Sequence, residues 1–176
     1  TSSRAEDKSA GTAVSNNGCV VKTVRYIGRA AHGGSSPHLG VDAPYAANLA
    51  LSAINALRET FQERDTIRVH PVITQGGRQV NVIPGEVQLE TYVRGKSVQA
   101  IMDANTKVDR ALRAGALAMG AQVEITTLPG YMPLTNNPAL GQVFRRSAEA
   151  LVGADRYVTQ GHRTGSTDMG DVSQIM

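Results

Sequence analysis

The sequence predicts an α+β fold in which a four-stranded antiparallel sheet carries two helices on one face. Four segments are rich in Val, Ile and Thr, as strands are, and two segments repeat apolar residues every three or four positions. Along the chain they follow the order strand, helix, strand, strand, helix, strand. Short connections join this order most simply in the ferredoxin-like β-α-β-β-α-β arrangement.

The first strand is predicted over Cys19–Ile27, and a loop follows it. Residues 29–40 contain three glycines and Pro37, which exclude regular structure. Within this loop His32 stands between two alanines and two glycines, so no bulky neighbour shields its imidazole. Histidine exchanges protons readily near neutral pH, which makes His32 a candidate for chemistry. The alternative is a loop histidine without a chemical role.

The first helix is predicted to begin at Asp42, which is a suitable N-cap, with Pro44 in the first turn. It should run for about five turns and end in the charged run 63–65. Its apolar stripe consists of Ala46, Ala50, Ala53, Leu57 and Phe61.

The second and third strands are predicted over Thr66–Thr74 and Glu86–Arg94. Pro71 lacks a backbone N–H, so the second strand should be an edge strand or should bulge there. The third strand alternates, which is typical of a sheet with one buried face. Its predicted inward residues are Val87, Leu89, Thr91 and Val93.

The second helix should begin after Ser97 as its N-cap and end at Gly120, and a last strand should cover Gln122–Leu128. Residues 19–129 thus form the predicted sheet domain. Residues 1–18 show neither helical nor strand period and are predicted to be a linker or a loose terminus.

Residues 130–176 are predicted to be an incomplete α/β segment. A helix begins at Asn137-Pro138 and ends at Gly153. This helix has an apolar stripe and no sheet of its own to lie on, which implies further structure around it.

Composition excludes several classes of protein. The net charge of +3 is small and evenly spread, and Tyr92 is the only clear aromatic candidate on the sheet, so we expect no nucleic-acid binding. No apolar run approaches the roughly 20 residues of a membrane span. The single cysteine, Cys19, allows no internal disulfide and is expected to be buried. We therefore expect a cytoplasmic protein.

Three polar residues are expected to gather on one rim of the sheet, around a pocket that another segment completes. Asn81 lies in the loop between the second and third strands, and Arg94 ends the third strand. An amide and a guanidinium together are a good receptor for a carboxylate, and His32 could donate to an oxyanion. The alternatives are a solvated charge for Arg94 and a turn-bracing residue for Asn81.

Other chemistry has weaker support in the sequence. The four histidines, at positions 32, 38, 70 and 162, show no metal-ligand spacing. His70, beside a proline, is expected to be structural. His162 with Asp168 and Asp171 could coordinate a cation, but a loop with helix-capping aspartates is the favoured interpretation. A Gly-x-Ser-x-Gly motif and a P-loop are absent.

Six motifs in order resemble the M20 metallopeptidase and amidohydrolase family, and the later ones are similar to aminobenzoyl-glutamate or N-acyl amino acid hydrolases. They occupy residues 28–32, 76–84, 92–94, 114–120, 129–134 and 165–171. The resemblance implies a two-metal catalytic domain that is interrupted by a smaller, ferredoxin-like lid, which usually mediates dimerisation. Residues 19–129 would be the lid and residues 130–176 the opening of the second catalytic half.

The resemblance also implies roles for the three polar residues. His32 matches a lid histidine that reaches the partner subunit's active site and polarises the scissile amide carbonyl. Asn81 and Arg94 match lid residues that bind the terminal carboxylate of the substrate. The implied protein is a homodimer that acts on a small acyl- or aryl-amino acid.

The resemblance is incomplete where metal ligands are concerned, because the chain has no His-x-Asp sequence and no Glu-Glu pair. We expect that the chain by itself binds no cofactor and hydrolyses no amide. Two divalent ions, zinc or manganese, would belong to the parent enzyme. The alternative function is a stand-alone ferredoxin-like module for dimerisation or small-ligand binding, without catalysis.

Overall fold

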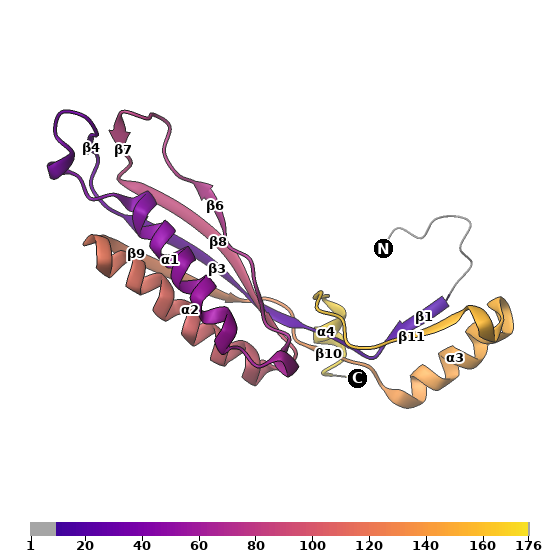
Figure 1. Cartoon of the computed structure of the whole chain (residues 1–176). Helices are drawn as coiled ribbons and strands as arrows, with labels where there is room; N and C mark the ends of the chain where they lie inside the picture. The colour runs from indigo at the N-terminus through magenta and orange to yellow at the C-terminus, as the bar shows by residue number, and fades with distance from the viewer. Residues whose placement is uncertain (1–9, 176) are drawn as a thin grey trace.

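Strand β3 lies at the centre of the fold in a computed structural model of the chain, which describes residues 10–175. It pairs antiparallel with β8 on one side and with β9 on the other, and β5 and β6 pair with the outer side of β8 (Figure 1). The sheet order is therefore β5/β6, β8, β3, β9. The strands are β3 (Gly18–Ile27), β5 (Arg68–Val69), β6 (Val72–Gln75), β8 (Glu86–Gly95) and β9 (Gln122–Pro129).

The predicted strand over 66–74 is divided in two at Pro71. Strand β5 ends at Val69 and β6 begins at Val72, because the proline has no N–H to donate to the ladder. Among the described strands both pair with β8 alone, so the predicted edge position is confirmed.

Helix α1 (Ala43–Leu57) begins as predicted and ends earlier. The Asp42 carboxylate accepts the Tyr45 N–H at 2.9 Å, and Pro44 lies in the first turn. The helix ends at Leu57, and beyond it the backbone tightens, with the Phe61 N–H donating to the Arg58 carbonyl at 3.3 Å. The predicted five turns were wrong: the 15-residue helix makes about four, and two 3₁₀ turns follow, η2 (Arg58–Thr60) and η3 (Glu63–Asp65).

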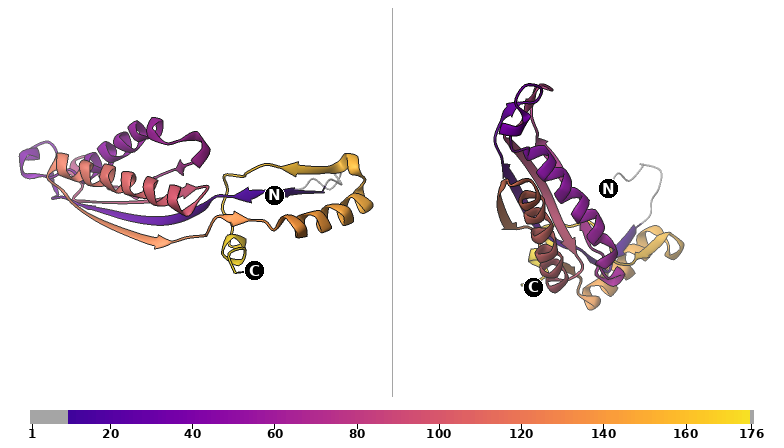
Figure 2. Two further views of the ribbon diagram at one scale, coloured as in Figure 1. Left: turned by 90° about the horizontal axis from the view of Figure 1, so that it is seen from below. Right: turned by 60° about the vertical axis from the view of Figure 1, so that its left-hand side comes forward.

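Helix α2 (Val98–Met119) has both predicted caps. The Ser97 hydroxyl accepts the Ala100 N–H at 3.2 Å, and Gly120 adopts the left-handed conformation with φ of 67°. Both helices lie on one face of the sheet (Figure 2). They approach closely at Gly115, where a Cβ would collide with the Ala46 carbonyl oxygen. The predicted inward residues of β8 are buried, with Val87, Leu89 and Val93 fully so.

A buried charge lies inside this mainly apolar layer. Lys22 on β3 is fully buried, and its ammonium donates to Asp109 on α2 at 2.5 Å and to the Thr127 hydroxyl on β9 at 2.6 Å. A buried ammonium is tolerated only when it is paired. These contacts therefore fix α2 against two strands.

A second, smaller part is formed by both ends of the described chain, and we name it the terminal unit (residues 10–16 and 131–175). Strand β1 pairs parallel with β11, and β2 pairs antiparallel with β10. We name residues 18–129 the sheet unit. The elements of the terminal unit are β1 (Ala10–Ala13), β2 (Ser15–Asn16), β10 (Leu134–Thr135), α3 (Pro138–Val152), η4 (Ala154–Arg156), β11 (Tyr157–Gln160) and α4 (Met169–Val172).

The prediction of a linker over residues 1–18 was wrong for the part that the structure describes. Residues 10–13 and 15–16 form strands whose partners lie at the other end of the chain, so no local pattern announces them. Residues 1–9 lie outside the described residues.

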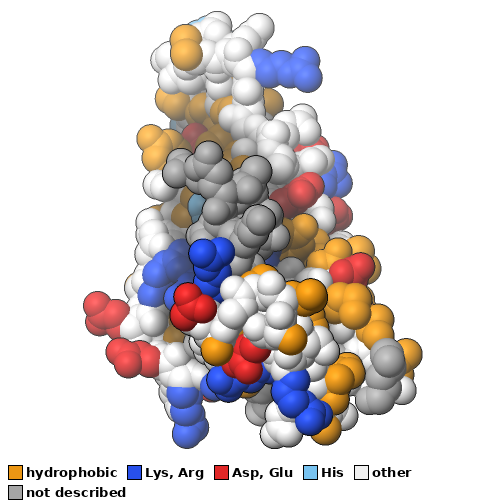
Figure 3. Space-filling model, turned by 90° about the vertical axis from the view of Figure 1, so that its right-hand side faces the viewer, with side chains coloured by type: hydrophobic (Ala, Val, Ile, Leu, Met, Phe, Trp, Pro, Cys, Tyr) orange, Lys and Arg blue, Asp and Glu red, His pale blue; other side chains and the backbone are white. Residues whose placement is uncertain are grey.

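Helix α3 begins at the predicted N-cap, Asn137, whose side chain accepts the Ala139 and Leu140 N–H groups, and it ends at Gly153. Its apolar residues Leu140, Phe144 and Leu151 are exposed. Figure 3 views this end of the molecule and shows hydrophobic side chains on the surface beside charged ones. Within residues 10–175, no helix combines the length and apolar character that crossing a bilayer requires.

We predict that removing one partner of the buried pair costs more than removing both. Asp109→Ala leaves the Lys22 ammonium buried and unpaired and should lower the free energy of unfolding by about 2–4 kcal/mol. Lys22→Met together with Asp109→Ala should be closer to the wild type. Urea denaturation followed by circular dichroism measures both. Glu149→Ala, which breaks the exposed pair with Arg145, is the control and should change stability by less than about 1 kcal/mol. Equal losses for the single and double variants would contradict the prediction.

Candidate functional site

The loops that carry His32 and Asn81 meet at one end of the sheet unit, which we name the tip (residues 29–40 and 76–85). Strand β4 (Ala31–His32) pairs antiparallel with β7 (Val82–Ile83), and the short helix η1 (Pro37–Leu39) follows β4 (Figure 1). The prediction that residues 29–40 contain no regular structure was therefore wrong, because the strand partner of β4 lies about 50 residues away along the chain. The Gly33 N–H donates to the Asn81 carbonyl at 2.8 Å. His32 faces Val82 across this two-stranded ladder, and Asn81 is the residue next to Val82 along the chain. Both His32 and Asn81 are exposed.

The protonation pattern of the His32 ring follows from its contacts. Its Nδ1 atom accepts the N–H groups of Gly34 and Ser35, each at 3.1 Å. In the neutral ring the proton must then reside on Nε2. These two bonds fix the ring against its own loop, so His32 offers solvent one oriented N–H donor.

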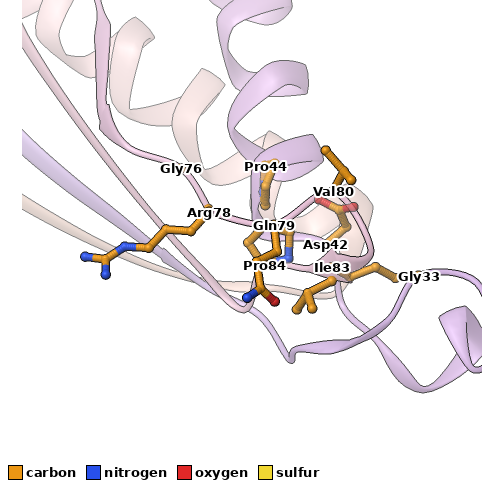
Figure 4. Close-up of a pocket in the computed structure, with 11 residues that line it drawn as sticks. Gly33, Asp42, Pro44, Gly76, Arg78, Gln79, Val80, Ile83 and Pro84 are labelled. Atoms are coloured by element: carbon orange, nitrogen blue, oxygen red, sulfur yellow. The ribbon is translucent and has the colours of Figure 1, made fainter.

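The loop that carries Asn81 is shaped by Gly77 and Pro84. Gly77 has a φ of 100°, and a Cβ there would stand 2.5 Å from the Pro84 ring. A cavity of about 450 Å³ lies behind this loop and is bordered by Asp42, at the start of α1. Figure 4 shows its lining residues, with the Arg78 side chain extending away from the others. Neither His32 nor Asn81 lines this cavity, so the two candidate residues lie outside it.

An ion-pair network lies on the face of the sheet that the helices leave uncovered, next to the tip. The Arg25 guanidinium on β3 binds both carboxylate oxygens of Glu86 on β8, at 2.7 and 2.9 Å, and Glu124 on β9 at 3.3 Å. The hydrogen bonds from Arg25 lower the pKa of Glu86. This network therefore connects three strands. The ion pair with Glu86 weakens as the pH falls through the lowered pKa of that residue.

Arg94 lies at the opposite end of β8, at the junction with the terminal unit. Its Nη1 donates to the Ser166 hydroxyl at 3.1 Å, and its guanidinium carbon lies 4.9 Å from the centre of the Tyr92 ring. Arg94 lines a cavity of about 280 Å³ between the two units. The other lining residues are Cys19, Val21, Tyr92, Pro129, Gly130, Tyr131 and Ser166.

The structure therefore brings His32 and Asn81 together and holds Arg94 away from them. Residues 86 to 94 of β8 separate the tip from Arg94, and eight steps of about 3.4 Å span roughly 27 Å. The predicted convergence of all three on one rim is wrong within a single chain. Register decides this: Arg94 pairs with Cys19 at the start of β3, whereas His32 follows the end of β3.

Ser166 and Tyr131 are site residues that the sequence interpretation missed. Both lie in segments that carry the resemblance, 129–134 and 165–171, yet no pattern within those segments points to Arg94. Cys19 is buried as predicted and contributes to the same cavity wall.

Across residues 10–175, no group of three or more His, Cys, Asp or Glu side chains is placed to hold a metal ion. The Asp171 carboxylate accepts the Met132 N–H at 2.9 Å, and His162 bonds Ser15 and Asn17 instead of a carboxylate. These residues do not fit the cation site considered for His162, Asp168 and Asp171. The predicted helix-capping role also lacks a side-chain bond, because Asp168 precedes α4 without one.

Comparison with known proteins gives consistent matches. The family model described as the peptidase dimerisation domain matches residues 15–119. Among curated proteins, the Xaa-Arg dipeptidase of Mus musculus is 34% identical over 159 residues, covering 88% of this chain and 36% of that protein. A p-aminobenzoyl-glutamate hydrolase chain of Escherichia coli is 32% identical over 101 residues, covering 57% of this chain and 21% of its own length. The chain thus spans about a third or less of these relatives.

Solved structures share the fold. A tripeptidase from Staphylococcus aureus superposes with a TM-score of 0.73 at 24% identity, covering 95% of this chain and 43% of that one. The aminobenzoyl-glutamate utilization protein from Klebsiella pneumoniae gives a TM-score of 0.70 at 22% identity, covering 96% of this chain and 42% of its own length.

We predict that Gly77 is required for the shape of the tip. Gly77→Ala places a Cβ against Pro84 at a positive φ and should destabilise the protein by about 1–3 kcal/mol. Hydrogen exchange at the Val82 amide, which donates to the Gln79 carbonyl, should also become faster. Gly76→Ala is the matched control, because Gly76 lacks a positive φ and its Cβ would meet one side-chain atom, Cγ2 of Ile73, at 3.2 Å. Equal effects of the two substitutions would contradict the prediction.

Proposed function

The chain belongs to the M20 peptidase dimerisation-domain family, and on this premise we propose that it is the lid of a homodimeric, metal-dependent amide hydrolase. In this proposal residues 19–129 form the ferredoxin-like lid, which the strand order and the one-sided helices support. Residues 130–176 belong to the catalytic half. The parallel pair of β1 and β11 supports this assignment, because parallel strands normally lie in larger sheets that are covered on both faces.

One observation carries the proposal: His32 and Asn81 are neighbours on the tip, with the His32 Nε2–H free to donate. Such a donor stabilises the oxyanion that forms when an amide carbonyl is attacked. The Asn81 amide and the Arg94 guanidinium are suited to bind a carboxylate. The substrate is thus a small acyl- or aryl-amino acid. Two relatives, a dipeptidase and an aminobenzoyl-glutamate hydrolase, are named for substrates with a terminal carboxylate.

Members of this family are generally metal-dependent hydrolases. We assign two divalent ions, zinc or manganese, to residues of the full-length protein other than those described, because the described residues form no ligand cluster. Activation of the attacking water is the chemistry that such ions supply when bound. A cytoplasmic location is also part of the proposal, and the single buried cysteine supports it.

The geometry determines how the three residues could share one substrate. His32 and Asn81 lie roughly 27 Å from Arg94 along the sheet, which is farther than side chains can bridge. If all three act together, the first two come from one protomer and Arg94 comes from the other. A twofold axis then creates two equivalent sites.

The edge strand β6 is the surface best placed to form such a dimer. Among the described strands it pairs with β8 alone, and Val72 and Ile73 on it are 51% and 43% exposed. An open edge pairs readily with a second edge. When two β6 edges pair antiparallel, the tip of one protomer lies beside the Arg94 end of its partner, as the shared site requires.

We predict that charge on the β6 edge prevents dimerisation. Val72→Lys with Ile73→Lys places two ammonium groups near their own symmetry mates and should convert dimer to monomer in size-exclusion chromatography with light scattering. Leu128→Lys on the opposite edge strand, β9, is the matched control, because Leu128 is similarly exposed at 56%. A monomeric wild-type chain, or dissociation by Leu128→Lys alone, would contradict the assignment to β6.

We predict that two inactive variants of the full-length enzyme restore each other. His32→Ala should lower kcat far more than it raises KM, and Arg94→Ala should chiefly raise KM. At substrate concentrations where each variant is inactive, remixed subunits should regain up to about a quarter of wild-type activity, because half the dimers are mixed and one of their two sites is intact.

The mixed dimer also separates the alternatives. If His32 and Arg94 of one protomer served the same site, every mixed site would carry one defect and no activity would return. Unchanged turnover in His32→Ala would contradict the role proposed for His32.

A further inference from the structure

A polar cluster joins the sheet unit to the terminal unit, and the chemistry proposed above does not use it. We name it the joint cluster, and it consists of Ser15, Asn17, Thr66 and His162. Asn17 is fully buried and His162 is half-buried. The His162 ring contacts the Ser15 hydroxyl through Nδ1 at 2.8 Å, and through Nε2 it contacts Asn17 Oδ1 at 2.8 Å and the Thr66 hydroxyl at 3.1 Å.

The hydrogen bonds determine which nitrogen of His162 carries the proton. The Asn17 amide donates to the Thr66 carbonyl at 2.9 Å, which fixes its Oδ1 as the atom that faces Thr66 and His162. This Oδ1 accepts the Thr66 hydroxyl at 2.7 Å. Since an amide oxygen only accepts, His162 Nε2 must donate to it, and the neutral ring then accepts from Ser15 at Nδ1. The cluster is complete with a neutral imidazole.

Thr66, which is the member of the cluster on the sheet unit, has an unfavourable backbone conformation. Thr66 has a φ of 49° and a ψ of 38°, and it is the only non-glycine residue with positive φ among residues 10–175. A β-branched residue rarely adopts this region, because its side chain then crowds the backbone. The two reciprocal bonds with Asn17 offset this strain. Such strain is usually retained where the surrounding contacts fix a functional geometry.

We propose that the joint cluster is a pH-sensitive clamp that fixes the orientation of the sheet unit relative to the terminal unit, and that proton uptake by His162 loosens it. His162 belongs to the terminal unit, Thr66 belongs to the sheet unit, and Asn17 lies on the connection between them. Two backbone hydrogen bonds lie beside the cluster. The Asn17 N–H donates to the Arg163 carbonyl, and the Arg163 N–H donates to the Ser15 carbonyl.

The charges around His162 support the direction of the switch. Burial lowers the pKa of His162, and the positive charge of Lys96 on the chain after β8 lowers it further. Arg163 adjoins His162, and Asp65 adjoins Thr66; the Asp65 carboxylate faces Arg64 at 4.0 Å, and its carbonyl accepts the Lys96 N–H. A lowered pKa in the folded state means that the clamp is fully formed above about pH 6.5 and weakens as the pH falls below it.

Loosening this clamp would affect the candidate site directly. Another side-chain bond across the junction runs from Arg94 to Ser166, within the cavity between the units. A change in the angle between the units would therefore alter the surroundings of Arg94. The test below concerns only orientation and protonation, so it does not depend on the catalytic role proposed for His32.

The test is nuclear magnetic resonance on the labelled 176-residue chain. Long-range ¹H–¹⁵N spectra of the histidine rings should show His162 protonated at Nε2 near pH 7.5, with a titration midpoint below about 6.5, the value of an unperturbed histidine. Residual dipolar couplings should fit one alignment tensor for both units at about pH 7.5 and should require two at about pH 5. Exchange protection of the Asn17 and Arg163 amides, corrected for intrinsic rates, should fall at least about threefold over the same interval.

Two variants sharpen the test. His162→Gln keeps a donor and an acceptor but cannot titrate, so its couplings and protection should be independent of pH. His70→Gln removes an exposed histidine of the sheet unit and should keep the wild-type pH dependence. The proposal fails if wild-type couplings fit one tensor at both pH values, if His162→Gln keeps the pH dependence, or if His162 is protonated at Nδ1. Because the ring spectra use the wild type, they decide the matter even if a variant does not fold.

Discussion

The structure depends on strand β3, which has two roles. It is the central strand of the sheet, and its first residues connect the sheet unit to the terminal unit. At its start the Cys19 N–H donates to the Tyr131 carbonyl at 2.7 Å, and the Gly130 N–H donates to the Cys19 carbonyl at 3.1 Å. The chain therefore leaves and re-enters the terminal unit at adjacent points. The tip, at the far end of the molecule, is held by its own ladder and turns (Figure 1). A group on the tip is free to meet another molecule, whereas Arg94 is committed to a cavity between the units.

Buried polar groups occur where elements from distant parts of the chain must be held in one register. Lys22 joins β3 to α2 and β9, and Asn17, on the connection between the two units, binds Thr66. An apolar contact would tolerate small shifts, but a buried ammonium or amide loses its partner when it moves. These polar groups therefore fix the relative positions of strands and helices more strictly than the alanine-rich core between α1 and α2 does.

The sequence by itself determined most of the local structure: the strands of the main sheet, the starts of α1, α2 and α3, the interruption at Pro71 and the inward face of β8. Each is decided by residues within a few positions of one another, through capping bonds, missing donors or side-chain alternation. The C-terminal end of α1 was not predicted, because the backbone changes to 3₁₀ turns after Leu57 while the apolar spacing continues to Phe61.

Only the tertiary structure decided the pairing of β1 with β11, the burial of Lys22 and the separation of Arg94 from His32 and Asn81. Strand partners at opposite ends of a chain leave no local period. The distance between candidate residues depends on strand register and strand length, and the positions of the loops along the sequence do not reveal either. His32 and Asn81 were predicted as neighbours because two adjacent loops carry them, and Arg94 was misplaced because a ten-residue strand carries it to the other end of the sheet.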